Sequence, residues 1–492
     1  MHLSTLLLAT ASTLTQALPE VIPRATTATI TIDTSKTYQT MDGFGFSEAF
    51  QRANLIVNLP AAKQASILDL LYNTTTGAGF SILRTGVGSS PDSSSDHMNS
   101  IEPKNPGGPS AAPNYTWDGK DSGQIFVAKK AKDYGVTTFY ANAWSAPGYM
   151  KTNGNENNGG YLCGVSGETC TSGDWKKAYA DYLIAYMKFY ANEGINFTHV
   201  GFLNEPQNAA SYAGMLSSGT QAADFIKVLY TELKAANMSN VAIACCDSEG
   251  WFVLFLSLDS QVSNIHRNDQ VGMTAQLRSA GVEPMIGIIT SHTYTSNFNG
   301  PIKTTAKVWQ TEYSDLNGGW TTAWYSSGGS GDGQTWASYV HNAVVNNNCS
   351  GYLYWVATQG GNTNEKMIQV TATDYTVSKR LWALAQFSRF IRPGAVRIGV
   401  TGSPSGLSTS AFVNDDTAPV YAGALVVPCL NTGSSSQSVT LSLKGYNGTT
   451  VGAWVTSQTQ EMVSMAATLG SDGTVTATLP GRSFVTFLVA AK

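Results

Sequence analysis

Residues 200–208, VGFLNEPQN, decide how the rest of the chain is interpreted. The stretch begins apolar, as the end of a buried β-strand does, and then places Glu205 between Asn204 and Pro206. A carboxylate is costly where the next buried residue should stand. The same pattern recurs in AKVWQTEYS, where Glu312 follows an apolar run. Both glutamates are therefore expected at points where a strand leaves the core.

Residues 42–392 alternate between short β-rich runs and longer amphipathic stretches. Eight runs are strand candidates: MDGFGF, FSILRTG, VTTFYANAW, FTHVGFLNE, VAIACCD, MIGIITSHTY, AKVWQTEYS and GYLYWVATQ. Helical spacing between them is clearest in DWKKAYADYLIAYMKFYANEG and least clear around WFVLFLSLD in the fifth unit. Eight strand–helix units predict an α/β protein with a (β/α)8 TIM barrel, whose active site lies at the carboxyl ends of the strands.

The two ends of the chain share a different pattern. Residues 393–492 are rich in Ser, Thr, Gly and Val and form short alternating runs such as SVTLSLKGYNG and SFVTFLVAA. This pattern is typical of a β-sandwich. Residues 25–41, including TATITIDTSKTYQ, alternate in the same way. We therefore expect one side β-sandwich built from both chain ends and attached to the barrel.

The bulk composition narrows the range of partners. Charged residues make up 13% of the 492-residue chain, and the formal net charge is −4. Nucleic-acid binding needs a basic patch that this sequence lacks, so no such partner is expected. No stretch after the N-terminus is long and apolar enough to predict a membrane span. No Cys or His cluster has metal-ligand spacing, and we expect a monomer without a metal or an organic cofactor.

Residues 1–17 resemble a secretory signal peptide, because a short apolar run leads to the small-residue site TQA. A secreted, extracellular protein is expected. Six N-x-[ST] sequons fit N-glycosylation: Asn73, Asn114, Asn196, Asn237, Asn348 and Asn447. Cys163 and Cys170 flank the Gly-rich GVSGET, which favours a local disulfide. Cys245 and Cys246 are adjacent on an apolar run and are expected to be buried.

Two carboxylates that face one cavity from nearly opposite strand ends are the requirement for glycoside hydrolysis. One carboxylic acid protonates the departing oxygen. The other carboxylate attacks the anomeric carbon or activates a water. A single Glu after a strand is usually a solvated loop residue. Glu205 and Glu312 are placed alike after their strands, so the pair favours catalysis.

Four segments together are similar to glycoside hydrolase family 30: MDGFGFSEAF, WSAPGYMKTNG, GFLNEP and WQTEYS. The likeness runs from about Asp42 to the C-terminus, side β-sandwich included. The resemblance implies a retaining, double-displacement mechanism. It places the acid/base on Glu205 and the nucleophile on Glu312.

Seven further residues are candidates for substrate binding: Arg52, Trp144, Asn204, Tyr294, Trp355, Arg84 and His292. Asn204 precedes the acid and is placed to hydrogen-bond a sugar 2-hydroxyl; the alternative is an amide that fixes the loop. Trp144 ends the third strand and Trp355 the eighth, so each offers a flat face to a sugar ring or packs in the core.

The remaining candidates are polar. Tyr294 follows the sixth strand and is placed to orient Glu312 through its hydroxyl. His292 lies nearby, where a structural role is the alternative. Arg84, in SILRTG, places a buried cation near Glu312 and helps to keep it ionised, unless it serves strand packing.

The resemblance is closest to the fungal xylanase group of the family. There an Arg after the first strand binds the carboxylate of a glucuronic acid branch on xylan, and Arg52 occupies that place in GFGFSEAFQRA. A surface Arg is the alternative. The expected substrate is plant cell-wall (glucurono)xylan, cut at β-1,4-xylosidic bonds by endo action or by release of xylobiose. Two alternatives are a β-1,6-galactanase or β-1,6-glucanase of the same family and a non-catalytic glycan-binding protein.

Overall fold

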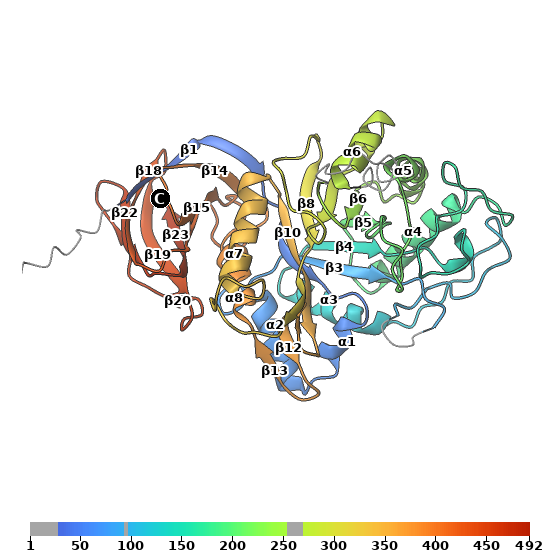
Figure 1. The fold of residues 1–492 in the computed structure, drawn as a ribbon, viewed down its shortest axis with the longest axis horizontal. Coiled ribbons are helices and arrows are strands. Elements are labelled where there is room, and N and C mark those ends of the chain that lie inside the picture. The colour runs from blue at the N-terminus through green and yellow to red at the C-terminus, as the bar shows by residue number, and fades with distance from the viewer. Residues whose placement is uncertain (1–27, 93–96, 253–268) are drawn as a thin grey trace, which may run out of the picture.

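The computed structural model describes residues 28–92, 97–252 and 269–492. The expected signal peptide, residues 1–17, and most of the WFVLFLSLD stretch lie outside these ranges. Figure 1 shows a barrel with helices around it and, beside it, an all-β domain that contains the C-terminus. The predicted fold class is confirmed.

Eight parallel strands form the barrel. They are β2 (Gly43–Ser47), β3 (Ile82–Val87), β4 (Thr138–Ala143), β5 (His199–Gly201), β6 (Ala242–Ser248), β7 (Ile288–His292), β8 (Lys307–Glu312) and β10 (Gly351–Gln359). Neighbours in the sequence pair with one another, and β10 pairs with both β2 and β8 and so closes the ring. Each of the eight sequence runs thus contributes one strand.

The helices follow the strands and cover the barrel from outside. They are α1 (Arg52–Val57), α2 (Ala61–Tyr72), α3 (Gln124–Asp133), α4 (Lys176–Asn192), α5 (Gly219–Ala235), α6 (Gln270–Ser279), α7 (Gly333–His341) and α8 (Lys379–Ser388). Helix α5 begins with a capping box, in which Ser218 accepts from the Gln221 N–H and the Gln221 side chain accepts from the Ser218 N–H. None of the helices in the described ranges has the length and hydropathy needed to cross a membrane.

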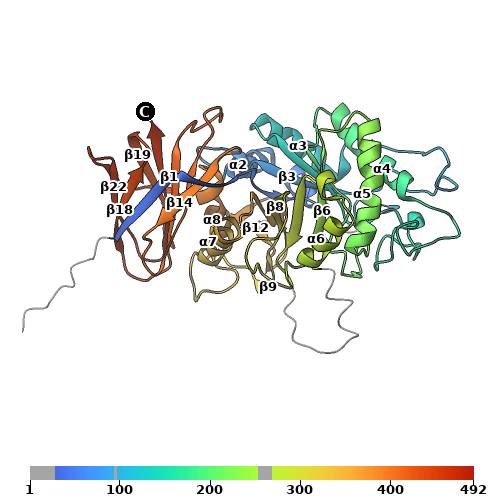
Figure 2. The ribbon, with the colours of Figure 1, turned by 90° about the horizontal axis from the view of Figure 1, so that it is seen from above.

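The side domain consists of one long sheet, which curves around a hydrophobic core of its own. Its strands are β1 (Ala28–Thr40), β14 (Val396–Thr401), β15 (Leu407–Thr409), β16 (Ala411–Val413), β17 (Leu425–Asn431), β18 (Gln437–Lys444), β19 (Gly448–Thr456), β20 (Val463–Ser464), β21 (Thr468–Leu469), β22 (Thr474–Leu479) and β23 (Ser483–Ala491). The N-terminal β1 lies between β14, antiparallel, and β18, parallel. In Figure 2 this strand runs from the sandwich toward the barrel, so both chain ends build the side domain.

Short strands decorate the mouth of the barrel. The strands β12 (Lys366–Val370) and β13 (Tyr375–Val377) extend the barrel sheet beyond β10, while β9 (Asp315–Gly319) pairs with β11 (Thr363–Asn364). The interior of the barrel holds an apolar cluster: Ile82, Tyr140, Ala244, Ile288, Trp309 and Leu353. Four of these strands carry a charged side chain farther along, namely Arg84, Asp247, His292 and Glu312, so charged groups gather toward the carboxyl ends.

Two disulfides are present among the described cysteines. Cys163 and Cys170 are joined, with their Cα atoms 5.5 Å apart, as the sequence predicts. Cys245 and Cys246 on β6 are buried as expected, but they are also bonded to each other across a cis peptide. Adjacency alone did not predict this bond, because neighbouring cysteines in a regular strand point to opposite faces.

The Cys163–Cys170 bond closes a short ring in the loop between β4 and α4. Replacing both cysteines with Ala should lower the free energy of unfolding by about 2 to 3 kcal/mol, because the bond restricts the unfolded chain. Denaturant unfolding of the double variant measures the change. Peptide mapping of the wild-type protein is the control, and free thiols at both positions would contradict the prediction.

Candidate active site

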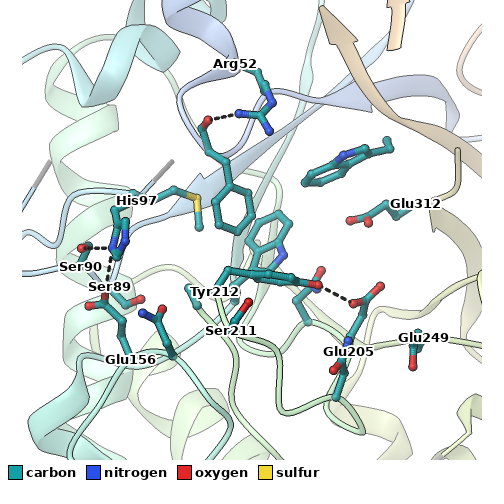
Figure 3. A pocket seen from close by; sticks show the side chains of 18 of the residues that line it. Arg52, Ser89, Ser90, His97, Glu156, Glu205, Ser211, Tyr212, Glu249 and Glu312 are labelled. Carbon is teal, nitrogen blue, oxygen red and sulfur yellow. Dashed lines mark hydrogen bonds and ion pairs between the residues drawn. The ribbon is translucent and has the colours of Figure 1, made fainter. Parts of the chain in front are cut away.

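Glu205 and Glu312 lie at the same end of the barrel. Glu312 is the last residue of β8, and Glu205 stands just after β5 in a left-handed conformation with φ 47°. One carboxylate oxygen of each lies within 4.8 Å of the other. Both glutamates line a cavity of about 390 Å³ at the mouth of the barrel. Figure 3 shows them on one side of this cavity.

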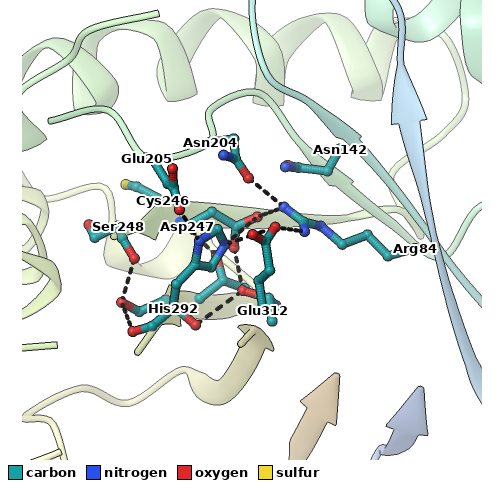
Figure 4. A network of polar contacts seen from close by, with 12 residues as sticks. Arg84, Asn142, Asn204, Glu205, Cys246, Asp247, Ser248, His292 and Glu312 are labelled. Carbon is teal, nitrogen blue, oxygen red and sulfur yellow. Dashed lines mark hydrogen bonds and ion pairs between the residues drawn. The ribbon is translucent and has the colours of Figure 1, made fainter. Parts of the chain in front are cut away.

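Arg84 is the cation at the centre of the polar network under this cavity (Figure 4). Its fully buried side chain stands on β3 and forms an ion pair with Glu312. Its Nη2 donates to Asn204 Oδ1 at 2.7 Å and to Asp247 Oδ2 at 2.8 Å. The Trp144 ring covers the guanidinium, with 4.4 Å from Cζ to the ring centroid. Arg84 thus binds both Glu312 and the side-chain amide of Asn204, the residue that precedes Glu205.

His292, the last residue of β7, lies beneath Glu205 and is fully buried. Its Nδ1 is 3.0 Å from Glu205 Oε1, and its Nε2 is 3.8 Å from Glu312 Oε2 and 3.9 Å from Asp247 Oδ2. Burial alone would lower the pKa of His292, but these carboxylates, Glu312 first, outweigh it and raise the pKa to about 10. The ring is therefore protonated at neutral pH and donates to Glu205.

The charge on Glu312 is set by opposing effects. Burial raises the pKa of the Glu312 carboxyl above its ordinary value. The cations His292 and Arg84 act to lower this pKa, and the nearby Glu205 acts to raise it. Two carboxylates at this distance do not ionise independently. The two cations therefore favour the ionised form of Glu312.

Two tyrosines flank the glutamates. The Tyr212 hydroxyl donates to Glu205 Oε2 at 3.2 Å, and the residue lines the cavity and is 43% exposed. Tyr294 lines the cavity, with its hydroxyl 3.5 Å from Ser314 Oγ. Burial and then the charge of Glu312 raise the pKa of Tyr294 well above its ordinary value, so it remains a neutral hydroxyl beside that glutamate.

Aromatic rings form the apolar part of the cavity. Trp144 and Trp355 both line it, with ring centroids 6.0 Å apart. Phe50 packs edge-on against each of them and against Tyr212. Flat apolar faces beside carboxylates suit a sugar ring, which has apolar C–H faces and polar edges.

Arg52 and His97 stand at other parts of the cavity wall, as Figure 3 shows. Arg52 begins α1, and its Nη1 donates to the Phe50 carbonyl at 2.7 Å. His97 lies in the loop after β3, with Nδ1 2.9 Å from Glu156 Oε1 and 2.8 Å from Ser90 Oγ. The loop after the second barrel strand therefore forms one wall of the cavity.

Two residues that were expected to bind substrate do not line the cavity. Arg84 and His292 have fully buried side chains and contact Glu312 and Glu205 rather than the open space. The reason is that both cations are drawn to the buried carboxylate of Asp247 as well as to the glutamates, which holds them below the open space. Their place is beneath the glutamates, and the other five candidates line the cavity itself.

Glu205, His292 and Glu312 also come close enough together to resemble a metal site, since one ligand atom of each lies within 4.8 Å of the others. A metal ligand must offer a lone pair, and protonated His292 has none on its ring nitrogens. Arg84 already pairs with Glu312 and would repel a cation there. The donor set therefore suits a charge-balanced carboxylate pair better than a metal ion.

Asp247 and Tyr212 are among the residues of this site that were not predicted from the sequence. Asp247 ends the run VAIACCD, so the strand-then-carboxylate pattern that identified Glu205 and Glu312 was present there too. Tyr212 lies in the irregular segment NAASYAG, which carries no periodic signal. Its position depends on how the loop after β5 folds over the cavity.

Two family models match the chain. The model described as O-Glycosyl hydrolase family 30 matches residues 27–368, and that of the Glycosyl hydrolase family 30 beta sandwich domain matches residues 394–487. The solved catalytic domain of GH30 xylanase C from Talaromyces cellulolyticus is 45% identical, with a TM-score of 0.85 and a match covering 94% of this chain and 100% of that one.

More distant relatives have other named activities. Endo-1,6-beta-D-glucanase BGN16.3 of Trichoderma harzianum is 25% identical over 413 residues, 78% of this chain and 77% of that protein. Glucuronoxylanase XynC of Bacillus subtilis is 22% identical over 377 residues, 74% of this chain and 77% of that protein. The relatives thus differ in substrate. Because the two family models cover both the barrel and the side domain, we conclude that the chain is a glycoside hydrolase of family 30.

Proposed function

We propose that the protein is a retaining glycoside hydrolase that cuts β-1,4-xylosidic bonds in glucuronoxylan. The observation that carries this proposal is the 45% identity, over nearly the whole chain, to a protein named xylanase C. The glucuronoxylanase of Bacillus subtilis is less similar, but the substrate in its name is also a xylan.

The proposed reaction has two displacements. Glu205 protonates the departing glycosidic oxygen while Glu312 attacks the anomeric carbon, and Glu205 then activates the water that releases the product. An oxygen separation within 4.8 Å supports this assignment. Inverting enzymes hold their carboxyl groups about 6.5 to 9.5 Å apart to fit a water between them.

A β-1,6-glucanase is the second candidate. It is favoured by the fungal relatives named endo-1,6-beta-D-glucanase, at 25% identity. A β-1,6-galactanase would use the same pair of glutamates. Digestion of glucuronoxylan, unbranched xylan, β-1,6-glucan and β-1,6-galactan, followed by mass spectrometry, separates these candidates. Xylobiose as the main early product would identify action at chain ends, whereas a ladder of longer products would identify endo action.

We also propose that the protein acts outside the cell and is a monomer; its N-terminal sequence and its sequons support the first of these statements. Five of the six sequon asparagines are exposed and Asn73 is half-buried. Deglycosylation of protein secreted by a fungal host, with mass measured before and after, tests this part.

Arg52 is proposed to bind the glucuronate carboxylate of a branched xylan. A bidentate, partly solvated contact of this type contributes about 1.5 to 3 kcal/mol. Arg52→Ala should therefore lower kcat/KM on glucuronoxylan by roughly ten- to a hundred-fold and leave unbranched xylo-oligosaccharides nearly unaffected. Arg52→Lys is the matched control, because it keeps the charge without the planar fork. An equal loss on both substrates would show that Arg52 does not read the branch.

A further inference from the structure

Glu249 is a third carboxylate at the cavity, and it has no part in the two displacements. It is the first residue after β6 and lines the cavity together with Glu205. Its side chain is half-buried. Within the described ranges, no group donates a hydrogen bond to the Glu249 carboxylate, and no cation forms an ion pair with it. Both oxygens are therefore available to a bound molecule.

The backbone of Glu249 is held in place by neighbouring loops. Its N–H donates to Gln207 Oε1 at 3.2 Å, and its carbonyl accepts from the N–H groups of Tyr294 at 3.0 Å and Thr295 at 3.2 Å. The next residue, Gly250, packs so closely on the following loop that a Cβ there would lie 2.3 Å from Thr295 Oγ1. The turn after β6 thus presents the Glu249 side chain to the cavity from a fixed backbone.

Glu249 stands on the leaving-group side of the cavity. Figure 3 shows it beyond Glu205 as seen from Glu312. Burial and then the charge of Glu205 raise the pKa of the Glu249 carboxyl, while His292 acts to lower it. In the proposed reaction the attacked sugar lies over Glu312, and the leaving group departs beside Glu205. A residue beyond Glu205 therefore faces the leaving glycosyl unit.

We propose that Glu249 is a substrate-binding residue for the leaving glycosyl unit, whose hydroxyls donate to its carboxylate. The inference rests on the proposed role of Glu205 as the acid/base. A hydrogen bond to a charged acceptor is about twice as strong as one between neutral groups. The same charge repels an acidic unit at this position. Glu249 thus selects a neutral sugar on the leaving-group side, whereas Arg52, elsewhere on the cavity wall, is the cation proposed to bind an acidic branch.

The test compares two substrates that differ only in the leaving group: a short oligosaccharide and an aryl glycoside with the same glycosyl unit. At neutral pH, Glu249→Ala should lower kcat/KM on the oligosaccharide about ten- to a hundred-fold more than on the aryl glycoside. The reason is that only the oligosaccharide places a sugar beside residue 249. Equal losses on both substrates, in a variant that unfolds like the wild type, would overturn the proposal.

The two substrates are taken from whichever of xylan or β-1,6-glucan the wild type cleaves. A wrong substrate assignment therefore does not affect the outcome. Azide rescue of Glu205→Ala tests the acid/base assignment separately.

Glu365→Ala is the matched control. Glu365 lines the same cavity and directly precedes β12. The neighbour of β12 is β10, whose Thr358 hydroxyl donates to the Arg52 carbonyl at 3.4 Å. Glu365 therefore stands on the side of Arg52, and its removal should change kcat/KM by the same factor on both substrates. A leaving-group effect in Glu365→Ala as large as that in Glu249→Ala would overturn the assignment to Glu249.

The selection by charge is tested with a pair of aryl glycosides whose leaving group carries either a carboxylate or the neutral amide of the same shape. Relative to Glu249→Gln, the wild type should disfavour the carboxylate by about fivefold in the ratio of the two kcat/KM values, the repulsion of two like charges about 4 Å apart in water. The different reactivity of the two leaving groups cancels in this comparison. The same ratio in Glu249→Gln and in the wild type would overturn the selection against acidic units.

Discussion

Glu312→Gln is expected to abolish turnover on every substrate, with a loss of about 10⁴-fold or more in kcat. The amide has nearly the shape of the carboxylate but cannot form the glycosyl–enzyme bond that the proposed mechanism requires. Steady-state rates on the polymer and on an aryl glycoside of the same sugar measure the loss. Thermal unfolding of the variant shows whether the network around Arg84 remains intact.

Glu205→Ala is the companion variant. It should lose about 10² to 10⁴-fold on the polymer, the usual contribution of general acid catalysis, and much less on an aryl glycoside whose leaving group needs no proton. Azide should restore activity to Glu205→Ala with retained stereochemistry. If azide instead gave a retained product with Glu312→Ala and had no effect on Glu205→Ala, the two roles would be reversed.

Arg84→Met is expected to have the largest effect on stability. The side chain is fully buried and pairs with Glu312 and Asp247, so its removal leaves two buried carboxylates without this cation. Breaking such a pair costs about 3 to 5 kcal/mol in the free energy of unfolding. Denaturant unfolding at neutral pH measures this loss.

The same variant should alter the pH profile. Arg84 acts to lower the pKa of Glu312, so without it that pKa rises and the nucleophile ionises only at higher pH. The acidic limb should move upward. Arg84→Lys, which keeps the charge but cannot reach Glu312, Asn204 and Asp247 at once, should lie between the variant and the wild type. An unchanged acidic limb in Arg84→Met would contradict the assigned electrostatic role.

The barrel and its two glutamates could be predicted because their signals are local. A run of apolar residues that ends in a carboxylate needs no knowledge of distant contacts, and eight such strand–helix units leave few folds to consider. Asp247 shows the limit of this reasoning. It has the same pattern as Glu205 and Glu312, but its side chain turns into the barrel, where Arg84 and His292 balance its charge.

Residues outside the strands were harder to place. Tyr212 contacts Glu205 through a loop whose path depends on neighbours far away in the sequence, such as the Ala213–Asn157 bridge. Arg84 and His292 were identified from the sequence as site residues, yet their depth was not, because periodicity gives the face of a strand and not the level of a side chain within the barrel.

The place of β1 in the side domain has a consequence for how the chain is made. Roughly 350 residues separate this strand from its partner β14, and synthesis at about 5 to 20 residues per second takes roughly 20 to 70 seconds to cover them. During that time Ile30 and Ile32, both destined for the sandwich core, have no sheet to join. The barrel is therefore synthesised while the apolar side chains of β1 are still without partner strands. A sandwich expressed from residues 394–487 alone would lack a central strand, with β14 and β18 left as open edges.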